Sequence, residues 1–194
     1  MPAIPTSTYS LLSHRLRRAA LALLCCVLPG LLLPAPALAD HSQSPDEYRV
    51  KAAFLYNFAR FTSWPMSDAT RFNVCIMGGN PFDGAVDALR EKLVHDLPLS
   101  VSYISDTRSV ANCQLLYISR TLASRVDQII AALGRRPILT VSDMEGFIRH
   151  GGVIGFLSVD NRIRFEINIT AASESGLSIS SKLLSLATTV VSGR

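Results

Sequence analysis

The sequence predicts one α/β domain: a mostly parallel, mixed sheet flanked by helices, ending in a β-hairpin and a C-terminal helix. Two observations support this fold class. Short apolar segments alternate with helical patterns through most of the chain, as in sheets whose parallel strands are joined by helices. Near the C-terminus, two strand-like segments flank Asp160-Asn161, which suits a two-residue hairpin turn.

Residues 1–39 are predicted to form a secretory signal peptide. A basic segment is followed by an apolar run at 19–33 and by the small residues of Ala37-Leu38-Ala39. The basic segment contains His14, Arg15, Arg17 and Arg18. The apolar run is shorter than the about 20 residues of a spanning helix and is interrupted by Pro29. We therefore expect cleavage after the Ala-Leu-Ala tripeptide, a mature domain at 40–194 and a periplasmic location.

Two alternatives to a cleaved signal peptide remain open. The first is an uncleaved membrane anchor. The second is a lipoprotein acylated at Cys25 or Cys26, which is disfavoured because Leu23 and Leu24 stand where a lipobox has a small residue.

Export changes the charge of the chain. The full chain has 19 Lys and Arg against 15 Asp and Glu. Three of the basic residues lie in the predicted signal peptide, which leaves 16 against 15, a net charge near +1 instead of +4. A nucleic-acid-binding protein needs a clustered basic face, so no nucleic acid is expected as a partner. The mature chain is long enough for one domain with a single core.

Two of the four cysteines, Cys75 and Cys113, lie in the predicted mature domain. An even pair in an oxidising compartment is expected to form a disulfide. Closing this loop stabilises the fold by about 4 kcal/mol in the chain-entropy model. Two buried free thiols are the alternative, and a metal site is disfavoured because neither cysteine belongs to a CxxC pair.

The first helix is predicted at 44–63. Ser44 is a capping residue, Pro45 suits the first turn, and two acidic residues follow it. The predicted apolar face consists of Val50, Phe54, Phe58 and Phe61. The polar residues off this face are Lys51, Asn57 and Arg60. The helix is expected to end before Pro65.

The middle of the chain is predicted to contain four strands and two helices. The strands are predicted at 72–77, 99–104, 113–118 and 138–141. One helix is predicted at 83–94, with Val86, Leu89 and Leu93 facing inward. The other follows the third strand, and its inward residues are Val126, Ile129, Ile130 and Leu133.

The C-terminal part is predicted to contain a hairpin of strands 153–159 and 162–169 and a last helix at 177–191. In the second strand, Ile163, Phe165, Ile167 and Ile169 alternate with polar residues. One face of this strand is therefore core, and the other is exposed or covered by something polar. The last helix is predicted to turn Leu183, Leu186, Ala187 and Val190 inward.

No set of residues predicts catalysis, so the chain is expected not to be an enzyme and to need no cofactor or metal. GxSxG and SxxK are absent from the sequence. The histidines of the mature domain are His41, His95 and His150, and a triad built on His150 is disfavoured. Gly78-Gly79-Asn80 lacks the phosphate-loop patterns. A turn is the simpler interpretation, and an anion at the next helix start is the alternative.

Two surfaces are candidates for binding a partner or a ligand. The first is the polar face of the second hairpin strand, formed by Arg162, Arg164, Glu166 and Asn168. The second is the corner of Arg60 and Trp64, because Trp and Arg often anchor interfaces. A solvated face and a core tryptophan are the respective alternatives.

Several sequence blocks together resemble the YfiR-type periplasmic family. They are VKAAFLYNFARFTSWP (50–65), FNVCIMGGNPF (72–82), RPILTVSD (136–143), GGVIGF (151–156) and RFEINITAASESGLSISSKLLSLA (164–187). The resemblance extends over nearly all of the mature chain, and its last block is long and specific.

The resemblance implies a regulator. Proteins similar to the best-known member bind the periplasmic domain of an inner-membrane diguanylate cyclase of the YfiN type and hold it inactive. An outer-membrane lipoprotein of the YfiB type can sequester the repressor, and a homodimer is expected. The conserved disulfide of the family maps onto Cys75 and Cys113. A second disulfide of the best-known member has no counterpart here, which argues against redox switching through that bridge.

A second function follows from the same fold. The domain would be a small-molecule-binding module with a pocket near Gly78 and the strand ends. An anion or an amino acid in that pocket would tune a sensor kinase or a receptor.

Overall fold

The computed structural model describes residues 45–65 and 68–192. The predicted signal peptide lies outside the described residues. No helix in these two ranges is long and apolar enough to cross a membrane.

The helices are α2 (Pro45–Arg60), α3 (Val126–Leu133), α4 (Ile169–Glu174) and α5 (Ser181–Leu184). The strands are β1 (Thr62–Ser63), β2 (Phe72–Met77), β3 (Leu93–Val94), β4 (Leu97–Ile104), β5 (Leu115–Ile118), β6 (Leu139–Ser142), β7 (Ile154–Val159), β8 (Arg162–Asn168), β9 (Ser178–Ile179) and β10 (Thr189–Val191).

One eight-stranded sheet organises the domain, with the order β10-β8-β7-β6-β5-β2-β4-β3. Neighbouring strands are parallel except in the pairs β3–β4 and β7–β8. The chain steps from β2 to β4 on one side and then continues through β5, β6 and β7 on the other side of β2. The mostly parallel, mixed sheet and its terminal hairpin are confirmed.

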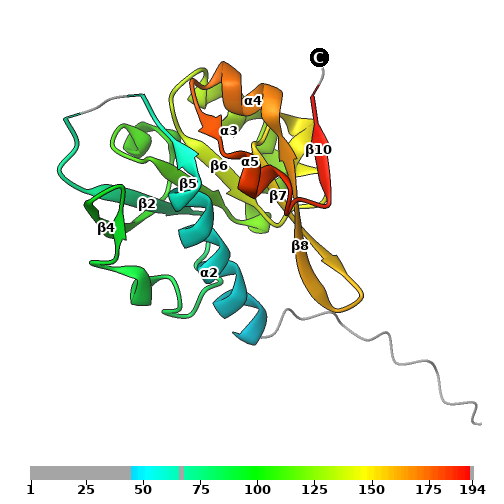
Figure 1. Cartoon of the computed structure of the whole chain (residues 1–194), viewed down its shortest axis with the longest axis horizontal. Helices are drawn as coiled ribbons and strands as arrows, with labels where there is room; N and C mark the ends of the chain where they lie inside the picture. Colours follow the sequence, from blue (N-terminus) through cyan, green and yellow to red (C-terminus); the bar gives the residue numbers. More distant parts are fainter. Residues whose placement is uncertain (1–44, 66–67, 193–194) are drawn as a thin grey trace, which may run out of the picture. The chain divides into compact units, whose positions relative to one another are not determined.

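Both faces of the sheet are covered, because alternate residues of the central strands β2 and β5 enter different cores (Figure 1). In β2, Val74 and Ile76 pack on the side of α2, whereas Cys75 and Met77 pack on the side of α3. Strand β5 alternates in the same way. This double burial explains why the central strands are almost continuously apolar.

The predicted disulfide between Cys75 and Cys113 is present. Their Cα atoms lie 5.8 Å apart, and both residues are buried in the core beside α3. The bridge ties β2 to the segment that enters β5.

Helix α2 buries a face that matches the predicted one only in part: Phe58 is fully buried and Phe54 and Phe61 pack against the core, but Val50 does not. Its buried residues are Tyr48, Lys51, Ala52, Leu55, Phe58 and Ala59. Val50, predicted to face the core, is 46% exposed, whereas Lys51 is 1% exposed. Phe54 still touches Phe58 and Phe165 from the edge of the buried face. The prediction followed the largest apolar side chains and missed the buried lysine.

The predicted helix at 83–94 is wrong. The segment forms turns, a short 3₁₀ helix (Asp87–Leu89) and strand β3. Asp83, Gly84 and Glu91 have positive φ angles of 44°, 80° and 62°, which a right-handed helix excludes. Leu93, predicted to face inward, is 57% exposed.

The C-terminal helix is present but short. Ser180 caps α5, because its hydroxyl accepts from the Leu183 N–H at 3.3 Å. The rest of the predicted helix at 177–191 is wrong: β9 precedes α5, and β10 follows as an edge strand parallel to β8. The β-branched residues of β10 favour an extended backbone. Leu186, predicted to be buried, is 61% exposed.

The hairpin turn at Asp160-Asn161 is confirmed. Val159 pairs with Arg162, and the two turn residues have φ angles of 49° and 59°. Positive φ at both positions is the geometry of a type I′ turn, whose twist matches that of the strands.

Candidate functional site

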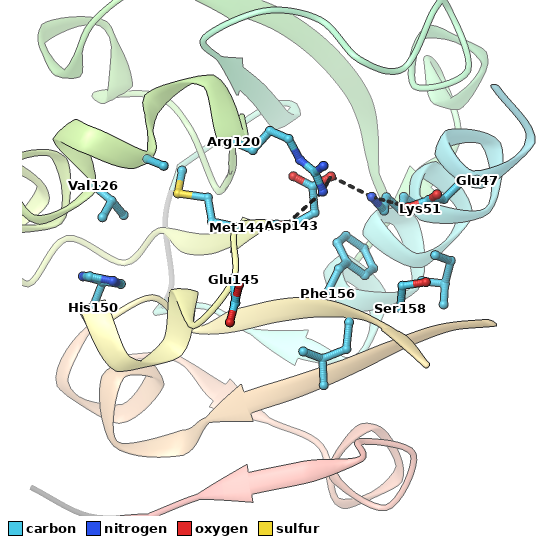
Figure 2. Close-up of a pocket in the computed structure, with 13 residues that line it drawn as sticks. Glu47, Lys51, Arg120, Val126, Asp143, Met144, Glu145, His150, Phe156 and Ser158 are labelled. Atoms are coloured by element: carbon cyan, nitrogen blue, oxygen red, sulfur yellow. Dashed lines mark hydrogen bonds and ion pairs between the residues drawn. The ribbon is translucent and has the colours of Figure 1, made fainter. Parts of the chain in front are cut away.

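A cavity of about 580 Å³ lies at the carboxyl ends of β5, β6 and β7, beside the first turns of α2 (Figure 2). Arg120 follows β5, Asp143 follows β6, and Ser158 lies in the last part of β7. Helix α2 contributes Glu47 and Lys51. In open sheets of parallel strands, ligands bind outside the carboxyl ends of the strands.

An ion pair between Lys51 and Asp143 forms the inner wall of this cavity. The Lys51 Nζ lies 2.6 Å from Asp143 Oδ2 and 2.8 Å from Glu47 Oε1. The side chains of Lys51 and Asp143 are 1% and 2% exposed. Since isolated buried charges are strongly disfavoured, each of these two groups depends on the other.

Tyr48 and Arg120 complete the environment of Asp143. The Tyr48 hydroxyl donates to Asp143 Oδ2 at 2.8 Å. Arg120 Nη2 donates to the Asp143 carbonyl at 3.3 Å and lies 3.4 Å from its Oδ2. The Tyr117 hydroxyl is buried close to the Asp143 carboxylate and interacts with it.

These contacts shift the pKa values of the cluster. Burial alone would raise the pKa of Asp143, but the charges of Lys51 and Arg120 outweigh it, so this pKa is lowered. Burial and the Asp143 charge raise the pKa of Tyr48 and of Tyr117. The carboxylate is therefore ionised and both phenols are neutral at pH 7.

The lowered pKa of Asp143 predicts a loss of stability in acid. Its stabilising effect is fully present above the ordinary carboxyl pKa of about 4 and is lost as the pH falls through the lower folded-state value. The urea midpoint of the natural protein should fall between about pH 5 and pH 3. In the variant Lys51→Met/Asp143→Leu, which retains the other carboxyl groups, this fall should be smaller. Equal falls in the two proteins contradict the prediction.

The end of β6 is held rigidly to β5 beneath this cluster. The buried Ser142 hydroxyl donates to the Ile118 carbonyl at 2.7 Å and accepts from the Met144 N–H at 3.1 Å. These bonds set the direction in which the chain leaves β6 and so position Asp143.

The predicted polar face of β8 divides into two parts. Arg162 and Arg164 are exposed near the hairpin turn. Glu166 is half-buried, and burial raises its pKa although Arg149 acts in the opposite direction. Asn168 caps α4: its Oδ1 accepts from the Ala171 N–H at 2.9 Å, and its Nδ2 donates to the Ile148 carbonyl at 3.1 Å.

The Arg60 and Trp64 corner is remote from β8 in the sheet order. Trp64 packs on Phe72 at the start of β2, and its Nε1 donates to the Gln114 carbonyl at 3.1 Å. Three strands separate β2 from β8. Arg60 is exposed, with its guanidinium 5.6 Å from the centre of the Tyr56 ring. A second cavity, of about 640 Å³, lies beside Trp64 at the amino ends of the strands.

The glycines at the end of β2 form a turn. Turns at 81–86 follow Gly78-Gly79-Asn80, and the next helical element is the three-residue 3₁₀ helix Asp87–Leu89, so no α-helix starts there to bind the anion that the sequence allowed. A Cβ at position 78 would lie 2.7 Å from Leu122 Cδ1, and Gly78 has a φ of 80°. The Leu122 side chain therefore packs directly against Gly78.

His150 does not complete a catalytic triad with the serine of this cavity. Its Nδ1 lies 2.7 Å from Asp127 Oδ1, at the surface. Ser158 lies at the other end of the cavity in Figure 2. No group of His, Cys, Asp or Glu within the described ranges is arranged to hold a metal ion.

Sequence reasoning missed Lys51, Asp143 and Arg120. The one available signal was Lys51 between the apolar residues Val50 and Ala52, since a buried lysine requires a partner. That partner lies 92 residues away. No sequence spacing could have identified it.

Comparisons with known proteins identified a family and solved structures that are similar in part. The crystal structure of a conserved domain protein from Vibrio cholerae O1 biovar El Tor has a TM-score of 0.48 and 13% sequence identity to this chain. The similarity covers 74% of this chain and 60% of that protein. The search of curated proteins gave no match. The YfiR/HmsC-like family matches over residues 48–188, a range that contains most of α2, the disulfide and the hairpin, and this chain therefore belongs to the YfiR/HmsC-like family.

Proposed function

We propose that this chain is a periplasmic regulatory protein that binds the periplasmic sensor domain of an inner-membrane diguanylate cyclase of the YfiN type and represses it, lowering cyclic di-GMP. The observation that carries this proposal is membership of the YfiR/HmsC-like family across residues 48–188. That family is regulatory rather than catalytic. The disulfide agrees with a mature domain at 40–194 that is exported after removal of 1–39.

The mechanism is a shift of a conformational equilibrium. A homodimer of this chain binds the inactive conformation of the cyclase sensor more tightly than the active one, and the inactive population rises by that difference in affinity. An outer-membrane lipoprotein of the YfiB type that binds the free repressor reverses the shift.

The hairpin end of β8 is the better supported docking surface. Arg162 and Arg164 are exposed on one face there, beside Val159, which is 42% exposed. Arginines around an exposed apolar residue suit an interface with an acidic rim on the partner. Asn168 contributes to the cap of α4 instead, and Trp64 is partly covered by Phe72, which leaves Arg60 as the exposed member of the second corner.

A charge reversal tests this surface. The variant Arg162→Glu/Arg164→Glu should weaken capture of the cyclase from solubilised membranes by about 10-fold or more, since like charges would face each other. The matched control is Arg108→Glu, because the Arg108 side chain is 90% exposed and pairs only with Asp106 among the described residues. Mass spectrometry should identify a membrane protein with a GGDEF output domain. Recovery of soluble periplasmic chaperones alone contradicts the proposal.

A second function is supported by the cavity at the carboxyl ends of the strands. Its volume of about 580 Å³ lies within the range of small-molecule sites. The domain would then be a binding module whose ligand tunes a sensor kinase or a receptor. A neighbouring gene for a GGDEF membrane protein favours repression, whereas a kinase or receptor gene favours the module.

A further inference from the structure

We infer that the cavity beside Arg120 binds a small monocarboxylate with an apolar body. The carboxylate would lie on the Arg120 guanidinium, and the apolar body on the wall formed by β7 and β8. This inference rests on the second function, the binding module, and is independent of the identity of any protein partner.

Arg120 is held in place while part of its guanidinium remains available. Its protein contacts, within the described ranges, use Nη2 alone, and they reach Asp143 at 3.3 and 3.4 Å. The side chain is 47% exposed and lines the cavity. An arginine held on one side by protein oxygens presents its other donors in a planar fork, which matches a carboxylate.

Lys51 does not compete for the ligand. Its ammonium lies between Asp143 and Glu47, at 2.6 and 2.8 Å, and its side chain is 1% exposed. The cation that a ligand can reach from the cavity on this wall is therefore Arg120 (Figure 2).

The acidic groups of the cavity limit the charge of the ligand. Glu47 is 19% exposed, and exposed Glu145 also lines the cavity. A phosphate or a dicarboxylate would place additional negative charge near these carboxylates. A ligand with one negative charge therefore matches Arg120 better than a ligand with two.

The remaining lining is largely apolar. Its apolar residues include Val126, Met144, Phe156, Leu157 and Ile163. Burial of apolar ligand surface against such side chains supplies most of the affinity in small-molecule sites, and the polar group sets orientation. Ligands with a hydrocarbon or aromatic body are therefore favoured over small polar acids.

The test measures binding of 3-phenylpropionate to the purified, exported protein. At ten times its Kd, this probe should raise the Tm by about 3–6 °C. The matched probes are 3-phenylpropionamide, 3-phenylpropylamine and inorganic phosphate, and we expect smaller shifts from each. Calorimetric titration then gives Kd for the natural protein and its variants.

Three variants locate the site. Arg120→Gln should weaken binding of 3-phenylpropionate about 10- to 100-fold, the effect of losing charge-assisted hydrogen bonds. Ala123→Phe should also weaken binding, because exposed Ala123 lines the cavity and a larger side chain fills it. Arg108→Gln, outside the cavity, should bind as the natural protein does. Ala123 is exposed, so the unliganded Tm of Ala123→Phe should change little, whereas Arg120→Gln also removes a charge beside Asp143 and is therefore judged by its Kd.

Each outcome decides between the inference and the function on which it rests. Equal binding by Arg120→Gln and the natural protein overturns the assignment to Arg120. A Tm shift with 3-phenylpropylamine but not with 3-phenylpropionate overturns the assignment of a carboxylate ligand. The domain would then still be a small-molecule-binding module. If none of the four probes shifts the Tm, the result contradicts both the carboxylate ligand and the binding-module function.

Discussion

Replacing Lys51 with methionine is expected to lower the free energy of unfolding by about 3–5 kcal/mol. The substitution retains most of the side-chain volume but removes the ammonium 2.6 Å from Asp143. Asp143 is then left as a charge whose side chain is 2% exposed, with Arg120 at 3.4 Å as the remaining cation. The cost is the desolvation of an uncompensated carboxylate. Urea unfolding followed by circular dichroism at pH 7 measures this change.

A double substitution separates the charge from the packing. Lys51→Met/Asp143→Leu removes both charges and should recover most of the lost stability, because an apolar pair of similar volume often replaces a buried ion pair at little cost. The surface control is Lys92→Met, since Lys92 is exposed and should lose at most about 1 kcal/mol. A loss below about 1 kcal/mol in Lys51→Met would show that the pair does not stabilise the fold. If the double variant does not recover this free energy of unfolding, the loss in Lys51→Met comes from altered packing.

Removal of the disulfide is expected to have a similar effect, about 4 kcal/mol. The bridge closes a loop with a sequence separation of 38, and its absence raises the entropy of the unfolded chain. For a domain of this size, the Tm should fall by roughly 8–16 °C. Cys75→Ala/Cys113→Ala measures the effect by calorimetry.

The two single cysteine substitutions are the controls. Either one removes the bridge, so each should lose about as much stability as the double variant. Because both sulfurs are buried, the natural protein should resist alkylation until it is unfolded and reduced. Free reaction of both thiols in native, unreduced protein would contradict the disulfide.

Local patterns predicted the strands and the hairpin well. The predicted strand at Phe72–Met77 has the observed bounds, and the hairpin turn at Asp160-Asn161 follows from residues that tolerate positive φ. These features depend on neighbours within a few residues. For the same reason, the repeat of apolar residues in α3 was sufficient to predict that helix.

The helix predicted at 83–94 failed because the apolar spacing there has another cause. Val86 and Leu89 are buried, as predicted, but turns and a short 3₁₀ helix position them. His95 and Asp96 then turn the chain with φ angles of 49° and 65°, which pairs β3 with β4. Asp96 tolerates positive φ, but β3 has only two residues, so the hairpin was not evident from the sequence.

The sequence by itself determined the fold class, the pairing of Cys75 with Cys113 and the family to which this chain belongs. The tertiary structure alone decided which face of α2 is buried, and it brought Lys51 to Asp143 beside Arg120. The physical reason is the separation along the sequence of the residues that interact. Strand periodicity and turn geometry depend on adjacent residues, whereas a buried charge is stabilised by a group 92 residues away that only the folded sheet brings within 2.6 Å.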